Sequence, residues 1–148
     1  SSDVCSSDLV VNGLREGKGI YYIFEGSRYE GYWKNDKREG KGIDYWNDGD
    51  LYIGENKNGH MNGKGIYYYN SGDRYEGNFK NGKRDGKGIY YYNNGDRYEG
   101  DWKNDKCEGK GIIYFNNGDR RMGDFLNDEE TGKHVYLTKN GEVKENNY

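Results

Sequence analysis

The sequence lacks proline and alanine altogether, and it has only five leucines, two cysteines and two histidines among 148 residues. A chain so poor in strong helix formers is not expected to be helical. Two cysteines are too few for a disulfide framework or for a thiolate metal site. There is no run of 18 apolar residues, so the sequence predicts no membrane-spanning helix. A net charge of −3 gives no general attraction to nucleic acid phosphates, and we expect no nucleic acid partner.

Aromatic residues are the abundant class, with 17 Tyr, three Trp and four Phe. Only 31% of the residues are hydrophobic and 33% are charged, a balance typical of disordered chains. The 16% aromatic content argues against disorder, and aromatic residues favour strands. The composition therefore predicts an all-β protein.

The first nine residues, SSDVCSSDL, repeat Ser-Ser-Asp and share no pattern with the rest of the chain. We interpret residues 1–9 as a non-native leader and expect that part of the natural N-terminal region is missing. Cys107 is then the one thiol left to consider. Any catalytic domain would lie in the missing upstream region.

A repeat of 23 residues covers the remainder of the chain. The segments RYEGNFKNGKRDGKGIYYYNNGD and RYEGDWKNDKCEGKGIIYFNNGD are identical at 16 of 23 positions. The predicted domains are a partial repeat at 10–27, full repeats at 28–50, 51–73, 74–96 and 97–119, and a degenerate capping repeat with a tail at 120–148. In that last repeat, Arg121 and His134 replace the Tyr and Gly of the others.

Asn-Gly and Asp-Gly pairs between short aromatic runs predict β-hairpins. A two-residue turn at Asn94-Gly95 would place Tyr91 opposite Tyr98 and Ile89 opposite Gly100. The polar stretch 103–111 reads as a loop of several residues. These signals predict an elongated single-layer antiparallel meander of about 10 to 11 strands, twisted into a ribbon.

These repeats resemble MORN (membrane occupation and recognition nexus) repeats, through Tyr-Glu-Gly-x-Trp, Lys-Asn-Gly and Gly-x-Gly followed by an aromatic residue. The resemblance implies a twisted sheet of hairpins and a binding role, as a scaffold or accessory module. Asn56 departs from the pattern where other repeats carry an aromatic residue, and Cys107 replaces the basic residue found at Arg38 and Arg84.

The first candidate site is an aromatic face that docks a protein partner, either a peptide, a helix or a second copy of the chain. Its residues are Tyr29, Trp33, Tyr75, Phe79, Tyr98 and Trp102. The same rings are also what folding alone would require.

The alternative site is a basic loop edge that binds anionic phospholipid headgroups at a membrane surface. Its residues are Lys34, Lys37, Arg38, Lys41, Lys80, Lys83, Arg84, Lys87, Lys103, Lys106 and Lys110. Acidic residues between these cations weaken this hypothesis. A second alternative is a carbohydrate-binding aromatic repeat.

No residue pattern indicates catalysis. His60 and His134 are 74 positions apart, and we expect neither a metal nor a cofactor nor a small-molecule substrate. Glu30, Glu76 and Glu99 are expected to be charge partners of Arg28, Arg74 and Arg97. The sequence leaves the location in the cell open, with the cytoplasm or a membrane surface favoured over secretion.

Overall fold

The computed structural model describes residues 10–148, so the interpretation of residues 1–9 as a leader lies outside it. The described chain is β-structure throughout, apart from one 3-10 turn at Phe24–Gly26. The strands are β1 (Val10–Val11), β2 (Leu14–Arg15), β3 (Gly17–Tyr22), β4 (Arg28–Lys34), β5 (Lys37–Tyr45), β6 (Leu51–Lys57), β7 (His60–Tyr68), β8 (Arg74–Lys80), β9 (Lys83–Tyr91), β10 (Arg97–Lys103), β11 (Lys106–Tyr114), β12 (Arg120–Leu126), β13 (Glu129–Leu137) and β14 (Val143–Asn147).

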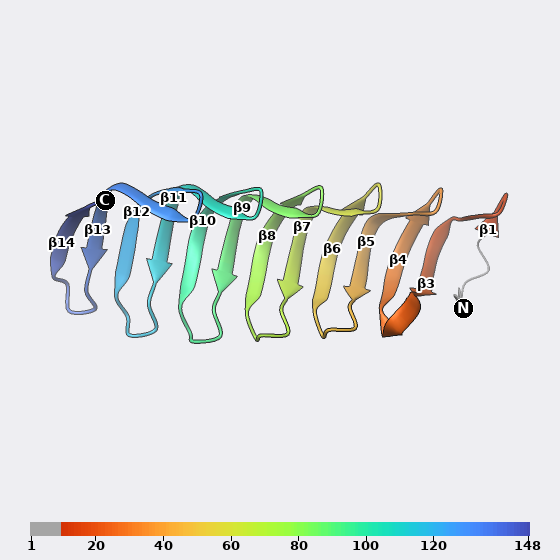
Figure 1. The fold of residues 1–148 in the computed structure, drawn as a ribbon, viewed down its shortest axis with the longest axis horizontal. Coiled ribbons are helices and arrows are strands. Elements are labelled where there is room, and N and C mark those ends of the chain that lie inside the picture. Colours follow the sequence, from red (N-terminus) through yellow and green to blue (C-terminus); the bar gives the residue numbers. More distant parts are fainter. Residues whose placement is uncertain (1–9) are drawn as a thin grey trace. The chain divides into compact units, whose positions relative to one another are not determined.

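Strands β3 to β14 have the order of the chain in one open antiparallel sheet of twelve strands, and β1 and β2 form a separate small hairpin (Figure 1). The predicted all-β meander of repeated hairpins is confirmed. The predicted strand number was too low, because residues 143–147 add a final strand to β13. The chain divides into two compact units. The first holds the described residues up to Asn70 with Phe79–Gly82, and the second holds Ser71–Asn78 with Lys83–Tyr148.

Two-residue turns close the hairpins at Asn35-Asp36, Asn58-Gly59, Asn81-Gly82, Asn104-Asp105 and Asn127-Asp128. Both residues of each turn have positive φ, for example 49° at Asn104 and 71° at Asp105, as a type I′ turn requires. The loop predicted at 103–111 was therefore wrong. Asn and Asp tolerate the left-handed conformation, so the chain reverses within two residues and β11 begins at Lys106.

The predicted tight turn at Asn94-Gly95 was also wrong, because the turn has three residues. The Tyr92 amide donates to the Asp96 carbonyl at 2.9 Å, and the Gly95 amide donates to the Tyr92 carbonyl at 3.0 Å. Gly95 has φ 92°, which suits the last position of such a loop.

The extra turn residue moves the register by one, so Tyr98 lies opposite Tyr90 and Gly100 lies opposite Gly88. A shift of one residue moves each side chain of a strand to the other face. Tyr91 and Ile89 therefore lie on the face opposite Tyr98, contrary to the predicted pairing. In each unit we call the face with the buried tyrosines the core face, and the opposite one the open face.

The core consists of tyrosine rings that lie over glycine pairs. Tyr98 is 2% exposed, and a Cβ built on Gly111 would lie 2.4 Å from its ring. The Tyr98 hydroxyl donates to the Asp101 carbonyl at 3.1 Å, next to a register shift in the β10–β11 pair. The same arrangement recurs at Tyr29, Tyr52 and Tyr75. The recurrent glycines are thus explained by the space that each ring occupies.

Candidate functional site

The six residues of the predicted aromatic face lie in the core. Their exposed fractions are 0% for Tyr29 and Tyr75, 2% for Tyr98, 5% for Phe79 and Trp102, and 8% for Trp33. In the first unit, the rings of Tyr29 and Trp33 meet edge to face at 5.1 Å. In the second unit, Trp102 packs in the same way against Tyr98, with ring centroids 5.2 Å apart.

These contacts bury the aromatic surface within the sheet itself. Ring pairs of this geometry stabilise a fold by about 0.5–1.5 kcal/mol beyond the area they bury. A partner that touched these six side chains would have to displace that packing. A docking surface on the folded chain must therefore be formed by other residues.

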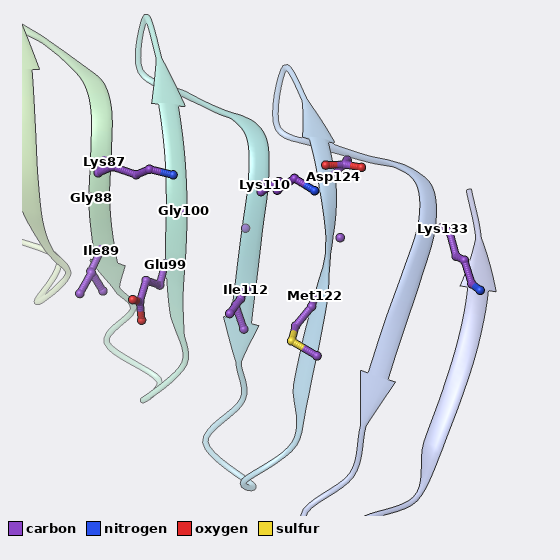
Figure 2. Close-up of a pocket in the computed structure, with 12 residues that line it drawn as sticks. Lys87, Gly88, Ile89, Glu99, Gly100, Lys110, Ile112, Met122, Asp124 and Lys133 are labelled. Carbon is purple, nitrogen blue, oxygen red and sulfur yellow. The ribbon is translucent and has the colours of Figure 1, made fainter.

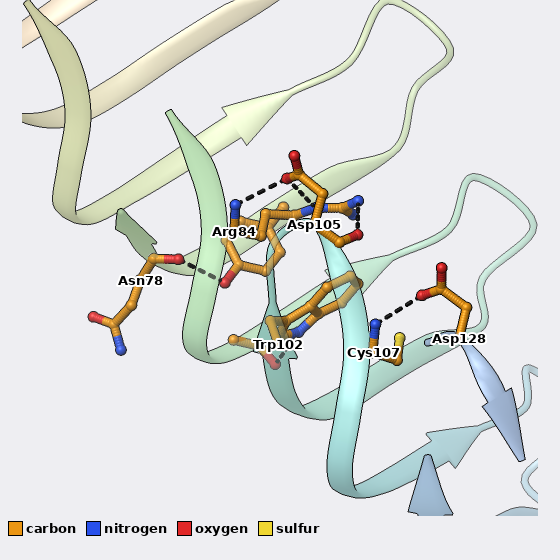
Figure 3. Close-up of polar contacts among 8 residues, drawn as sticks. Asn78, Arg84, Trp102, Asp105, Cys107 and Asp128 are labelled. Atoms are coloured by element: carbon orange, nitrogen blue, oxygen red, sulfur yellow. Dashed lines mark hydrogen bonds and ion pairs between the residues drawn. The ribbon is translucent and has the colours of Figure 1, made fainter. Parts of the chain in front are cut away.

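The two arginines of the predicted basic edge also lie against the core. The Arg84 guanidinium lies 4.3 Å from the Trp102 ring centroid, and its Nε donates to Asp105 Oδ1 at 3.2 Å (Figure 3). Arg38 forms an ion pair with the buried carboxylate of Asp44 and donates to the Gly59 carbonyl at 2.6 Å. Both cations therefore already have partners within the folded chain.

The nine lysines of the predicted edge divide into two groups. Six are exposed beside two-residue turns, namely Lys34, Lys37, Lys80, Lys83, Lys103 and Lys106. The others, Lys41, Lys87 and Lys110, lie inside strands on the open face. Acidic Asp36 and Asp105 occupy the turns beside the first group. The predicted single edge is therefore two separate surfaces.

The open face of the second unit carries a shallow groove of about 790 Å³. Lys87, Lys110 and Lys133 line one side together with Asp124, and Ile89, Ile112 and Met122 line the other, with Glu99 among them (Figure 2). Backbone at Gly88, Gly100, Gly111 and Gly123 forms the floor. The groove therefore crosses the strands, because its lining residues come from the five neighbouring strands β9 to β13.

The first unit carries a similar groove of about 520 Å³. Its lysines are Lys18, Lys41 and Lys64, spaced 23 residues apart like those of the second unit. Ile43 and Ile53 line the aliphatic side together with Glu30. Tyr32, which is 51% exposed, and Glu55 lie on the lysine side, opposite Lys18 and Lys41. Sequence reasoning missed both grooves, although the recurrent Lys-Gly-Ile triplet was a signal for them.

The glutamates expected as arginine partners have a different role. Glu99 lies opposite Ile89 and Ile112, and Glu30 opposite Ile20 and Ile43. The arginines stack on tyrosines instead. Arg28 lies 3.8 Å from the Tyr45 ring centroid, Arg74 4.2 Å from Tyr91 and Arg97 3.8 Å from Tyr114. Of the three expected arginine–glutamate pairs, only Arg74 and Glu76 form an ion pair, at 3.9 Å.

Burial favours the neutral forms of the thiol and phenol groups in the core. Burial raises the pKa of the Cys107 thiol to about 12, and nearby Asp128 adds to the shift. Burial likewise raises the pKa of Tyr29 to about 12. A thiol with so high a pKa has little thiolate at neutral pH and is a poor nucleophile.

The two histidines lie in different settings. His60 is exposed at the start of β7, whereas His134 is 1% exposed. The His134 ring lies over Gly123, and its Nε2 is 2.9 Å from the Asp124 carbonyl oxygen. Arg121 occupies the tyrosine position of this repeat and pairs with Glu130 at 2.7 Å. His134 therefore supplies the ring that Arg121 cannot.

Within residues 10–148, no three His, Cys, Asp or Glu side chains gather as metal ligands would. The same residues include no helix that has the length and apolar character to cross a membrane.

Five consecutive stretches match the family model of the MORN repeat, at residues 10–28, 29–51, 52–74, 75–97 and 98–120. They cover most of the chain, which therefore belongs to the MORN repeat family. No curated protein matches the chain in sequence.

Among solved structures, the fold is similar to the TCP domain of SAS-4 (dCPAP) of Drosophila melanogaster, in a complex with a proline-rich motif of Ana2 (dSTIL). That likeness has a TM-score of 0.51 at 18% identity, and it covers 88% of this chain and 78% of the other. At this identity it shows the fold alone.

Proposed function

We propose that this chain is a noncatalytic scaffold whose open face binds an extended segment of a protein partner. The observation that carries the proposal is the recurrence of one groove, with a basic side and an aliphatic side, in both units. Folding explains the core face, because its rings pack on one another. Folding alone does not explain exposed Ile53 and Tyr32 beside regularly spaced lysines.

Two comparisons support a binding role of this kind. MORN repeats are the family of this chain. The structurally similar SAS-4 domain forms its complex with a proline-rich motif of another protein. A shallow groove along a single sheet suits a narrow extended chain better than a compact domain, which would need a wide flat or concave surface.

The test is a selection of displayed random 15-residue peptides against the whole chain. Selected peptides should bind in solution and lose affinity by about tenfold or more when Ile53→Arg and Ile112→Arg place a charge in both grooves. The matched control is Leu126→Arg with Val143→Arg, two exposed apolar positions outside the grooves. It should change affinity by less than about twofold.

Two outcomes would contradict the proposal: no saturable binder emerges, or the selected peptides bind the groove variant and the control equally well. If the peptides do not bind but light scattering shows that the chain associates with itself, the partner is a second copy of the chain. Intrinsic fluorescence that responds to glycans would support the carbohydrate alternative.

Binding to anionic membranes is the second candidate, supported by the six exposed lysines beside the two-residue turns. Each such lysine is worth about 1 kcal/mol at an anionic surface, but the neighbouring Asp36 and Asp105 oppose the attraction. We expect no sedimentation with phosphatidylserine vesicles at about 0.15 M salt, where screening is strong. Binding that disappears in a Lys34→Glu, Lys103→Glu variant would favour the membrane instead.

A further inference from the structure

We infer that the groove of the first unit recognises a polyproline II segment with an acidic residue at every third position. This inference rests on the proposed function and names the conformation and chemistry of the partner. Three features of the groove carry it: the spacing of the repeats, the distance between its two sides, and the charges and rings that line it.

The spacing of the repeats matches one turn of a polyproline II helix. Neighbouring strands are about 4.8 Å apart, so equivalent positions in successive repeats are about 9.6 Å apart. Polyproline II rises about 3.1 Å per residue with three residues per turn, or about 9.3 Å per turn. A segment laid across the strands therefore presents the same side to Lys18, Lys41 and Lys64 in turn.

Other backbone conformations fit this spacing less well. Side chains of a β-strand repeat on one side at about 6.6 Å, which does not match the repeat distance. Seven residues of α-helix rise about 10.5 Å, and a helix with side chains is about 10–12 Å wide. The two sides of the groove come from residues two apart on a strand, such as Lys41 and Ile43, and are only about 6.6 Å apart.

The two sides of the groove have different chemistry. None of the ion pairs among residues 10–148 involves Lys18, Lys41 or Lys64. Their ammonium groups are exposed and suit carboxylates on the ligand. Ile53 on the aliphatic side is 41% exposed and Tyr32 beside Lys18 is 51% exposed, so both can cover proline rings.

The groove of the second unit is less suited to acidic ligands. Lys87 already pairs with Asp101 at 2.6 Å, and Lys133 pairs with Glu145 at 2.8 Å. A carboxylate on the ligand would have to compete with these internal partners. The lysine side of the first groove carries one carboxylate, Glu55 opposite Lys41, whereas the lysine side of the second carries Asp101 and Asp124. This difference assigns the acidic segment to the first unit.

The experiment uses fluorescence anisotropy with the whole chain at about 0.15 M salt. The probe is a labelled, capped peptide of four Glu-Pro-Pro triplets. One control peptide has the same composition with its four glutamates together at one end, and another has Lys in place of Glu. We expect saturable binding of the triplet peptide, at least about fivefold tighter than the same-composition isomer, with no binding of the lysine peptide.

Variants then locate the binding. Lys41→Glu should weaken the triplet peptide about fivefold, because one attraction becomes a repulsion. Lys34→Glu changes the net charge equally, lies beside a turn outside the groove, and should change affinity less than about twofold. Lys110→Glu makes the same change in the second groove and should also have little effect. Circular dichroism melting curves should show that all three variants remain folded.

The inference is overturned if the triplet peptide does not bind, if the isomer binds equally well, or if Lys34→Glu or Lys110→Glu weakens binding more than Lys41→Glu. These failures are distinct from failure of the proposed function. Displayed peptides that bind the grooves without a three-residue period would support the scaffold and reject the polyproline II segment.

Discussion

Individual glycines of the repeat are fixed by the tyrosine ring that lies over them. Gly100 and Gly111 face each other across β10 and β11, and a Cβ at either would come within 2.5 Å of Tyr98 side-chain atoms. Such an approach is shorter than any ordinary contact, and the buried ring has little room to move. The core therefore requires the second glycine of the Gly-Lys-Gly segment. The first glycine, such as Gly109 with φ 64°, adopts a backbone conformation that other residues avoid.

We predict that Gly111→Ala lowers the free energy of unfolding by about 3 kcal/mol, because the methyl group overpacks the Tyr98 site. Urea unfolding followed by tryptophan fluorescence measures the change. The control is Lys110→Ala at the adjacent exposed position, which should alter stability by less than about 0.5 kcal/mol. Equal stability of the two variants would contradict the packing described for Tyr98.

The Cys107 thiol provides a second test at the scale of single residues. Burial raises its pKa to about 12, so in a Cys5→Ser background we expect a disulfide reagent to label it slowly at pH 8 and rapidly in denaturant. Similar rates in both conditions would show that the thiol is exposed.

The same pKa shifts determine the effect of alkaline pH on stability. Cys107 has a reference pKa of 9.0 and Tyr29 one of 10.0, and both rise to about 12 in the folded chain. The unfolded chain therefore loses these protons first, and stability should fall as pH rises from about 9 towards 12. Melting temperatures across this range measure the effect, and a constant value would contradict it.

At the scale of elements, repeats differ in how they complete their cores. In the second unit, Arg84 is held by Asp105 and stacks on Trp102. In the first unit, the equivalent Arg38 pairs with Asp44. Asn56 occupies the position of Trp102, and its side-chain Nδ2 and Oδ1 atoms have no hydrogen-bond partner among the described residues. Burial raises the pKa of Asp44 despite the opposing Arg38. Buried polar groups without partners cost about 1–3 kcal/mol each.

We predict that transplanting the second arrangement stabilises the first unit. The variant Asp44→Tyr, Asn56→Trp, Gly59→Asp places the residues found at 90, 102 and 105 around Arg38. Its free energy of unfolding should rise by about 1–3 kcal/mol, measured in urea. Asp44→Tyr alone should be destabilising, since it removes the carboxylate that holds Arg38. A triple variant less stable than the parent would show that the two environments are not equivalent.

The sequence was sufficient to predict the 23-residue repeat and the all-β fold class, but not the lengths of the turns. Asn94-Gly95 and Asn104-Asp105 both suit left-handed backbone, and only the hydrogen bonds from Tyr92 and Gly95 show which turn has three residues. That single residue decides that Tyr90 faces the core and Tyr91 does not. His134 was interpreted as decay of the pattern, because its exchange with Arg121 involves two strands and is visible only in three dimensions.

At the scale of the whole molecule, burial separates the residues that make the sheet from those available to a partner. The aromatic residues that dominate the composition hold each unit together, while isoleucine and lysine at a 23-residue period line the open face. The three candidate surfaces, namely the aromatic core face, the basic turns and the open-face grooves, are formed by different residues. A bound peptide can therefore be assigned to one of them.

The most direct measurement is the change in amide and indole NMR signals of the labelled chain when a display-selected peptide binds. For a peptide assigned to the first unit by its sensitivity to Ile53→Arg, we predict the largest shifts at the groove floor, Gly31, Gly42 and Gly54. Signals of the Asn35-Asp36 turn and the Trp33 indole should change little. Largest shifts at that turn or that indole, with the glycine amides unmoved, would contradict the account.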